Sequence, residues 1–148
     1  MVVPEKSELD DFVELKAFEA LGSSGNLNLI RNTVSVPQAW AISRLMFPRV
    51  VVDNDCLILA ERFDRETMSS WRAEGLTARE IETVVNHLHL VDVFEGADAI
   101  ADELLVHLAD QIVLSWTFWL PRMTNRIVSA FSGDSEDGVY ITFHQGGL

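Results

Sequence analysis

Two histidines, His87 and His89, stand two residues apart and are the first candidates for chemistry in this chain. Residues at positions i and i+2 share a face on a strand but lie about 200° apart on a helix. The residues before the pair have a helical pattern, so we expect the two rings to point apart. Zinc needs three or four convergent ligands, and Asp92 could join the pair only if the helix unwound near Leu90. The sequence therefore predicts neither a metal site nor a cofactor.

An enzyme or small-ligand site built from dispersed residues is an alternative that the sequence leaves open. Its members would be one tryptophan, both histidines of the pair and the single tyrosine: Trp71, His87, His89 and Tyr140. No motif pairs a serine or cysteine nucleophile with a histidine, because such pairing is spatial. The single cysteine, Cys56, opens an apolar run without an adjacent positive charge. We interpret it as a core residue, since reactive thiols need an electropositive setting.

The charge of the chain is strongly negative, with 23 Asp and Glu against 11 Lys and Arg and a formal net charge of -12. Nucleic-acid binding is disfavoured because phosphate recognition needs clustered Lys and Arg. Docking on an anionic membrane surface is disfavoured for the same reason. A basic protein partner or a cationic ligand fits this field better, because complementary potentials accelerate encounter.

The densest group of acids surrounds the expected start of a long helix. Its members are Asp92, Glu95, Asp98, Asp102 and Glu103. A break in the helical pattern at Gly96 leaves several of them free to project outward. We therefore expect a non-catalytic protein-binding module. Its most concrete version is an inhibitor or immunity-type protein that masks a basic surface on a toxic enzyme.

The most aromatic segment contains Trp116, Phe118 and Trp119. Large aromatic side chains mostly serve packing, so we expect some of the three to lie in the core. The alternative is a homo-oligomer interface, where tryptophan anchors are enriched. In that case the protein would be a structural subunit.

Compartment signals favour a cytoplasmic protein. One cysteine excludes an internal disulfide, and the N-terminal residues lack the apolar core of a signal peptide. The longest apolar candidate, 112–120, is interrupted by Ser115 and Thr117 and falls short of the ~20 residues of a membrane span. The preference for Arg over Lys suits a bacterium with a GC-rich genome.

Helical patterns cover much of the chain. The first runs from Ser7 to Leu21, and a Gly/Ser-rich linker follows at 22–25. Asp64 caps a helix over 65–73. Thr77 and Glu80 form a capping box for a helix through about Leu90. A long helix is expected over 97–119, with Ile100, Leu104, Leu105, Leu108, Ile112 and Trp116 on its inner face.

Two segments have the pattern of β-hairpins, Arg49–Glu61 and Arg126–His144. Neither two-stranded unit is stable alone, so we expect both in one four-stranded antiparallel sheet with helices packed on one face. The whole chain, 1–148, is thus expected to form a single α+β domain. Residues 1–25 would be an appendage packed on its main body.

Overall fold

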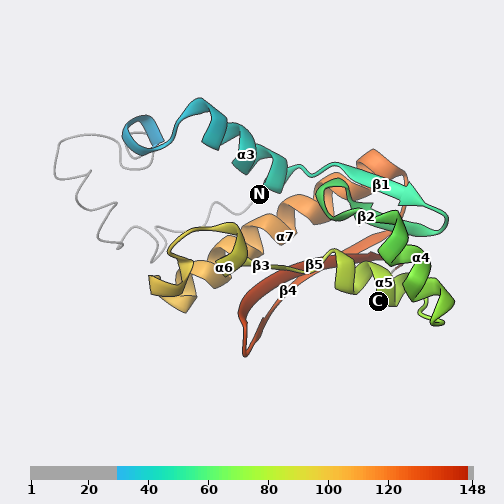
Figure 1. Ribbon diagram of the computed structural model, residues 1–148. Helices are drawn as coiled ribbons and strands as arrows, with labels where there is room; N and C mark the ends of the chain where they lie inside the picture. The colour runs from blue at the N-terminus through green and yellow to red at the C-terminus, as the bar shows by residue number, and fades with distance from the viewer. Residues whose placement is uncertain (1–29, 147–148) are drawn as a thin grey trace. The chain divides into compact units, whose positions relative to one another are not determined.

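The computed structural model describes residues 30–146 (Figure 1). The predicted first helix and linker lie outside these residues. The chain divides into two compact units, Met1–Ile42 and Ser43–Leu148, so the single domain stays a prediction. Helix α3 (Val36–Met46) begins in the first unit. Ser35 and Gln38 cap it reciprocally, through bonds of 2.8 Å and 3.3 Å between each backbone N–H and the other side chain.

Both predicted hairpins are present in the second unit. Strand β1 (Val50–Asp53) pairs with β2 (Cys56–Leu59), and Asn54 in the turn adopts the left-handed backbone that Asn tolerates, with φ 54°. Strand β4 (Val128–Ser135) pairs with β5 (Gly138–Gln145). The mixture of helices and antiparallel strands is thus confirmed.

The prediction of one four-stranded sheet is wrong. The first hairpin forms a two-stranded sheet, and the second gains a short strand, β3 (Leu88–His89), to form a three-stranded sheet of order β3-β5-β4. The separation has a local cause on β2. Alternate residues of an antiparallel strand direct their backbone groups to the same side. Leu57 and Leu59 direct theirs away from β1, toward side chains of helix α5 (Ala78–Val85) and the residue after it.

Two buried polar side chains, Glu82 and Asn86, occupy the place that another strand would take; we call them the polar bridge. On the β2 side, Leu57 N–H donates to Glu82 over 2.6 Å and Leu59 N–H donates to Asn86 over 2.9 Å. The Asn86 amide donates to the carbonyl of Leu57 over 2.9 Å. The edge of β2 is therefore satisfied without a strand beside it.

The polar bridge also contacts β5. The amide of Asn86 donates to the carbonyl of Phe143 over 3.2 Å, and Gln145 N–H donates to Glu82 over 2.7 Å. The side-chain amide of Gln145 donates to the same carboxylate. The two sheets are thus joined edge to edge through side chains. No backbone ladder connects β2 to β5, so the two hairpins belong to separate sheets.

The helix starts follow the predicted caps. Asp64 caps α4 (Arg65–Ala73) by accepting from Glu66 N–H over 3.0 Å. Thr77 and Glu80 form the predicted capping box of α5. The end of α5 differs from the prediction, because the helix stops at Val85 rather than near 90. The competing interaction is tertiary, since the residues beyond Asn86 pair with β5.

The predicted long helix over 97–119 is present over most of its length, but it begins and ends later than predicted, at 102 and 124. A short helix α6 (Leu90–Val93) and a 3-10 turn η3 (Ala97–Ala99) precede α7 (Asp102–Thr124). Gly96 separates the two short elements, with a left-handed φ of 78° that favours glycine. Pro121 does not end α7, which continues to Thr124 and is capped by Asn125 with a left-handed φ of 53°.

The main core lies between α7 and one face of the three-stranded sheet (Figure 1). Trp116 packs edge-on against Phe143 at 5.4 Å between ring centroids, and its indole N–H donates to the carbonyl of Leu45 over 2.7 Å. The buried side chains of α7 are Leu105, Ala109, Ile112, Trp116 and Leu120. Of the other predicted members of the inner face, Leu108 is half-buried and packs against this core, and Leu104 is half-buried. Ile100 is wrong, because it lies outside the helix and is 43% exposed.

Helices cover both faces of this sheet, not one face as predicted. Thr142 points to the face opposite Phe143, and its hydroxyl donates to the carbonyl of Thr83 on α5 over 2.9 Å. A second, smaller core forms between α4, α5 and β2 from Cys56, Ile58, Met68, Ile81 and Val85. The region where α5 ends against β5 positions the candidate site.

Candidate functional site

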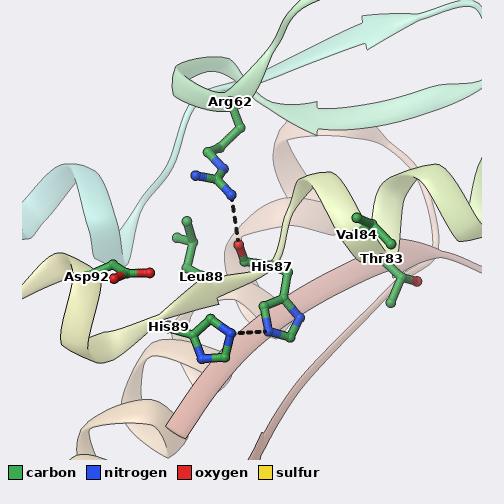
Figure 2. Close-up of a pocket in the computed structure, with 7 residues that line it drawn as sticks. All are labelled: Arg62, Thr83, Val84, His87, Leu88, His89 and Asp92. Atoms are coloured by element: carbon green, nitrogen blue, oxygen red, sulfur yellow. Dashed lines mark hydrogen bonds between the residues drawn. The ribbon is translucent and has the colours of Figure 1, made fainter. Parts of the chain in front are cut away.

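The two histidines point at each other, which corrects the expectation that they point apart. Figure 2 shows their rings side by side, with the two Nε2 atoms 3.1 Å apart. The reason is that α5 ends before them and the chain becomes extended, so that residues two apart share a face. Their ring centroids are 4.6 Å apart.

Tyr140 completes the aromatic group. It pairs with His89 across β3 and β5, and its ring stacks on His87 with 4.2 Å between centroids and 23° between planes. On the neighbouring strand, Tyr140 covers Gly133, where an added Cβ would lie 2.4 Å from the tyrosine oxygen. Only glycine leaves room for this ring, so the stack constrains β4 as well.

The histidines line an open pocket of about 270 Å³ (Figure 2). Its lining comes from the end of α5, the following strand and two flanking residues: Arg62, Thr83, Val84, His87, Leu88, His89 and Asp92. The guanidinium of Arg62 donates to the carbonyls of Val85 and His87, over 3.3 Å each. It thereby satisfies the carbonyl of Val85, the last residue of α5, and that of His87 just beyond the helix.

The pKa of His87 is lowered from its ordinary value of 6.5. Burial is the largest cause, and the nearby His89 and Arg62 act in the same direction. The neutral imidazole, which carries one unprotonated ring nitrogen, is therefore favoured at neutral pH.

The fourth predicted pocket member, Trp71, lies elsewhere. It packs against the smaller core and does not line the histidine pocket. Sequence reasoning missed Arg62 and Gly133, which reach the site only through tertiary contacts. The i, i+2 histidine spacing was the available signal, since it is typical of a strand with a shared face.

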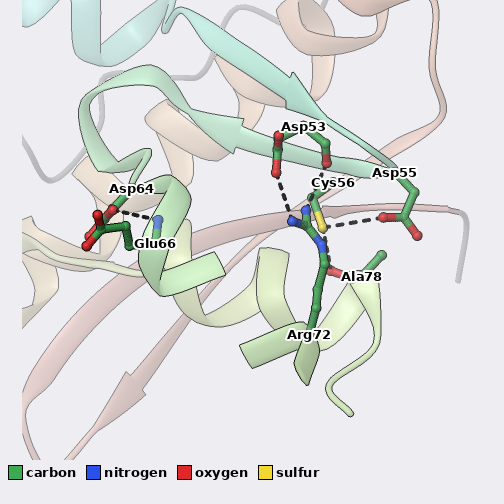
Figure 3. Close-up of polar contacts among 7 residues, drawn as sticks. All are labelled: Asp53, Asp55, Cys56, Asp64, Glu66, Arg72 and Ala78. Atoms are coloured by element: carbon green, nitrogen blue, oxygen red, sulfur yellow. Dashed lines mark hydrogen bonds and ion pairs between the residues drawn. The ribbon is translucent and has the colours of Figure 1, made fainter. Parts of the chain in front are cut away.

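Cys56 is fully buried, as the sequence predicted for a core residue. No positive charge is adjacent to Cys56 in the sequence, but in the fold Arg72 of α4 approaches the thiol (Figure 3). That guanidinium donates to the carboxylate and the carbonyl of Asp53, over 2.9 Å and 3.0 Å. Burial still raises the pKa of Cys56, with Arg72 opposing it. The thiol is a poor nucleophile in this setting.

The five acids singled out in the sequence form one continuous segment, 92–103, which we call the acidic segment. All five side chains are exposed: Asp92, Glu95, Asp98, Asp102 and Glu103. Within residues 30–146, no ion pair neutralises any of them. No Lys or Arg stands between Arg79 and Arg122 in the sequence. Among residues 30–146, the formal charge of this surface is therefore not neutralised by an ion pair.

Apolar side chains are exposed among and beside these carboxylates. Val93 is 39% exposed, Ile100 43% and Val106 40%. Asp102 and Glu103 also occupy the first turn of α7, where a carboxylate stabilises the helix dipole. The acidic segment thus combines negative charge with accessible apolar area.

The three aromatic residues considered for an oligomer interface have different surroundings. Trp116 is fully buried, and Trp119 is half-buried with its indole N–H donating to the carbonyl of Pro48 over 3.2 Å. Phe118 is 62% exposed, and the guanidinium of Arg122 lies 3.5 Å from its ring centroid. Of the three, Phe118 alone presents most of its surface outward, so the homo-oligomer stays a prediction.

No protein-family model, curated protein or solved structure matches this chain. In the part of the chain that the structure describes, no three His, Cys, Asp or Glu side chains converge as a metal site. The described helices include none that is long and apolar enough to cross a membrane.

Proposed function

We propose that this protein is a non-catalytic binding module that recognises a basic protein through its acidic segment. The observation that carries the proposal is the exposure of five carboxylates with no compensating ion pair among residues 30–146. Such a surface attracts a basic partner over roughly a Debye length, about 8 Å at physiological salt. The charge therefore acts mainly on the rate of encounter.

High affinity also needs contacts that slow dissociation of the complex. The exposed Val93, Ile100 and Val106 supply apolar area within and beside the carboxylates. An apolar centre with a charged rim is the usual anatomy of a protein interface. We propose a partner surface of Lys and Arg around an apolar patch, in which charge sets the orientation and apolar burial slows dissociation.

The most concrete form of the proposal is an immunity-type or inhibitor protein that acts in the cytoplasm of a bacterium. A small acidic protein of this kind would mask the basic surface of a toxic enzyme and prevent that enzyme from reaching an anionic substrate. Nucleic acids and anionic membranes are disfavoured as partners because the acidic segment repels phosphate.

The proposal is tested by capture with matched charge variants. Immobilised full-length protein is exposed to lysate of the source organism, and retained proteins are identified at low and high salt. One variant carries Asp98→Lys and Asp102→Lys in the acidic segment. The control carries Asp134→Lys and Glu136→Lys, which replace two exposed acids at the turn between β4 and β5.

Both variants change the formal net charge equally, by +4, from -12 to -8. The proposal predicts one basic partner that wild type and control retain and that the acidic-segment variant loses. Equal loss of the partner in both variants would mean that binding depends on net charge and not on the acidic segment. Retention by all three proteins would exclude the acidic segment as the binding surface.

A further inference from the structure

The distance between the two histidine Nε2 atoms matches the separation that one shared metal ion imposes. A metal–imidazole bond is about 2.0–2.1 Å long. Two such bonds meeting at roughly 90–109° hold their nitrogens about 2.9–3.4 Å apart. The observed separation of 3.1 Å between His87 and His89 falls within this range.

We propose that His87 and His89 chelate one divalent transition-metal ion through their Nε2 atoms, with the remaining coordination positions open to water or a small ligand. Imidazole suits copper, nickel and zinc, and the affinity of a given site rises to a maximum at Cu²⁺. The pocket shares Asp92 with the acidic segment, but the proposed metal site does not rest on the proposed protein binding.

The pocket is pre-arranged to accept a cation. In the metal-free protein the same 3.1 Å contact is a hydrogen bond between a donating and an accepting imidazole. When the metal binds, the Nε2 proton of the donating ring moves to its own Nδ1, so that both imidazoles stay neutral and both Nε2 atoms can coordinate. The two nitrogens already lie at the separation that the shared ion requires. Tyr140 stacks on His87 and limits its rotation, which lowers the conformational cost of ordering this ligand.

The charges that face the histidines are those of Arg62 and Asp92, which line the same pocket. Arg62 opposes a cation, but it is engaged with the carbonyls at the end of α5. Asp92 favours a cation, as does the formal net charge of -12. The field of the whole chain therefore favours a metal ion over an anionic ligand.

Two observations limit the affinity. No third protein ligand converges with the pair among the described residues. The Nδ1 atom of His89 is buried without a hydrogen-bond partner in that part of the chain. A metal-bound histidine is ordinarily held by a bond at its second nitrogen, and the lack of one weakens binding about 10- to 100-fold. The site is thus an open, exchangeable one.

The test is titration of the full chain with Cu²⁺ after treatment with EDTA and desalting. Binding is followed by calorimetry and by electron paramagnetic resonance, which detects coordinated nitrogen. His87→Gln and His89→Gln keep a planar polar side chain but remove the imidazole ligand. His107→Gln is the matched control, because His107 is an exposed histidine on α7.

We expect one Cu²⁺ per chain with nitrogen coordination. The affinity should fall at least about tenfold in either pocket variant and change less than about twofold in the control. Absence of binding, or binding that survives replacement of both pocket histidines, would overturn the proposal. Zn²⁺ titration of the wild type, followed by ¹⁵N shifts of histidine, tests it without any variant. Shifts at Nε2 of both pocket histidines support chelation, and unchanged shifts there contradict it.

Discussion

Replacing Asn86 with Ala should cost a large part of the stability of this protein. Asn86 is fully buried, and its side chain makes three hydrogen bonds to backbone groups of β2 and β5. The substitution leaves the N–H of Leu59 and the carbonyls of Leu57 and Phe143 without these partners. Because Leu57 and Leu59 face away from β1, no neighbouring strand replaces the lost bonds.

The magnitude follows from the three orphaned groups. An unsatisfied buried polar group costs about 1–3 kcal/mol, and water entering the space left by Ala recovers part of this, so we expect a loss of about 3–5 kcal/mol. Domains are stable by only about 5–15 kcal/mol, so the loss should be large. Val84→Ala on the same helix is the control, since Val84 is 53% exposed and should cost less than about 1 kcal/mol.

The assay is urea denaturation of wild type and both variants, followed by far-UV circular dichroism and tryptophan fluorescence. The Asn86→Ala midpoint should fall with an unchanged slope, provided that both probes report one transition. Asn86→Asp should be at least as destabilised near pH 7, because it directs an oxygen at two carbonyl oxygens. A loss below about 1 kcal/mol for Asn86→Ala would refute the polar bridge as the link between the sheets.

Three further predictions concern packing and titration. Ile112→Ala should destabilise by about 2–5 kcal/mol, and Leu114→Ala, at a residue 64% exposed, by less than about 1 kcal/mol, in the same denaturation assay; equal losses would mean that the inner face of α7 is misassigned. Gly133→Ala should destabilise by about 1–3 kcal/mol because its Cβ meets the ring of Tyr140, and adding Tyr140→Ala should remove that cost in a double-mutant cycle; additive losses would contradict the contact. Because the pKa of His87 is lowered in the folded chain, the neutral imidazole favours the folded state above the ordinary pKa of 6.5, and this stability is lost as the pH falls below that value, by at most about 1.4 kcal/mol per pH unit. The free energy of unfolding, measured in EDTA between pH 8 and 5, should therefore decline less in His87→Gln than in wild type, and parallel curves would refute this.

Local signals in the sequence predicted the element types and several of their ends. The capping box at Thr77 and the hairpin within Arg49–Glu61 appear where they were expected, because both depend on residues close in the chain. Sequence reasoning failed where a distant partner decides the outcome. Glu82 looks like an ordinary surface acid of a helix, yet it is buried because β2 and β5 both need an acceptor there.

The same competition explains the error at the candidate site. Helical periodicity predicted that the helix continues through His87. In the structure α5 ends at Val85, because the following residues pair with β5, and both histidines then lie on one face of the extended chain. The location of the acidic segment needed no tertiary information, since its carboxylates are close in sequence. Its proposed role as a docking surface still depends on a partner that the sequence does not identify.

The most direct test of the proposed function is the association rate constant with the captured basic partner, measured by surface-based kinetics at several salt concentrations. Electrostatic steering raises such rates about 10- to 1,000-fold. Asp98→Lys with Asp102→Lys should slow association at least about tenfold at low salt, with a smaller change in dissociation and a weaker salt dependence. The control, Asp134→Lys with Glu136→Lys, should change the association rate by less than about threefold. An association rate that ignores salt and responds equally to both variants would contradict recognition through the acidic segment.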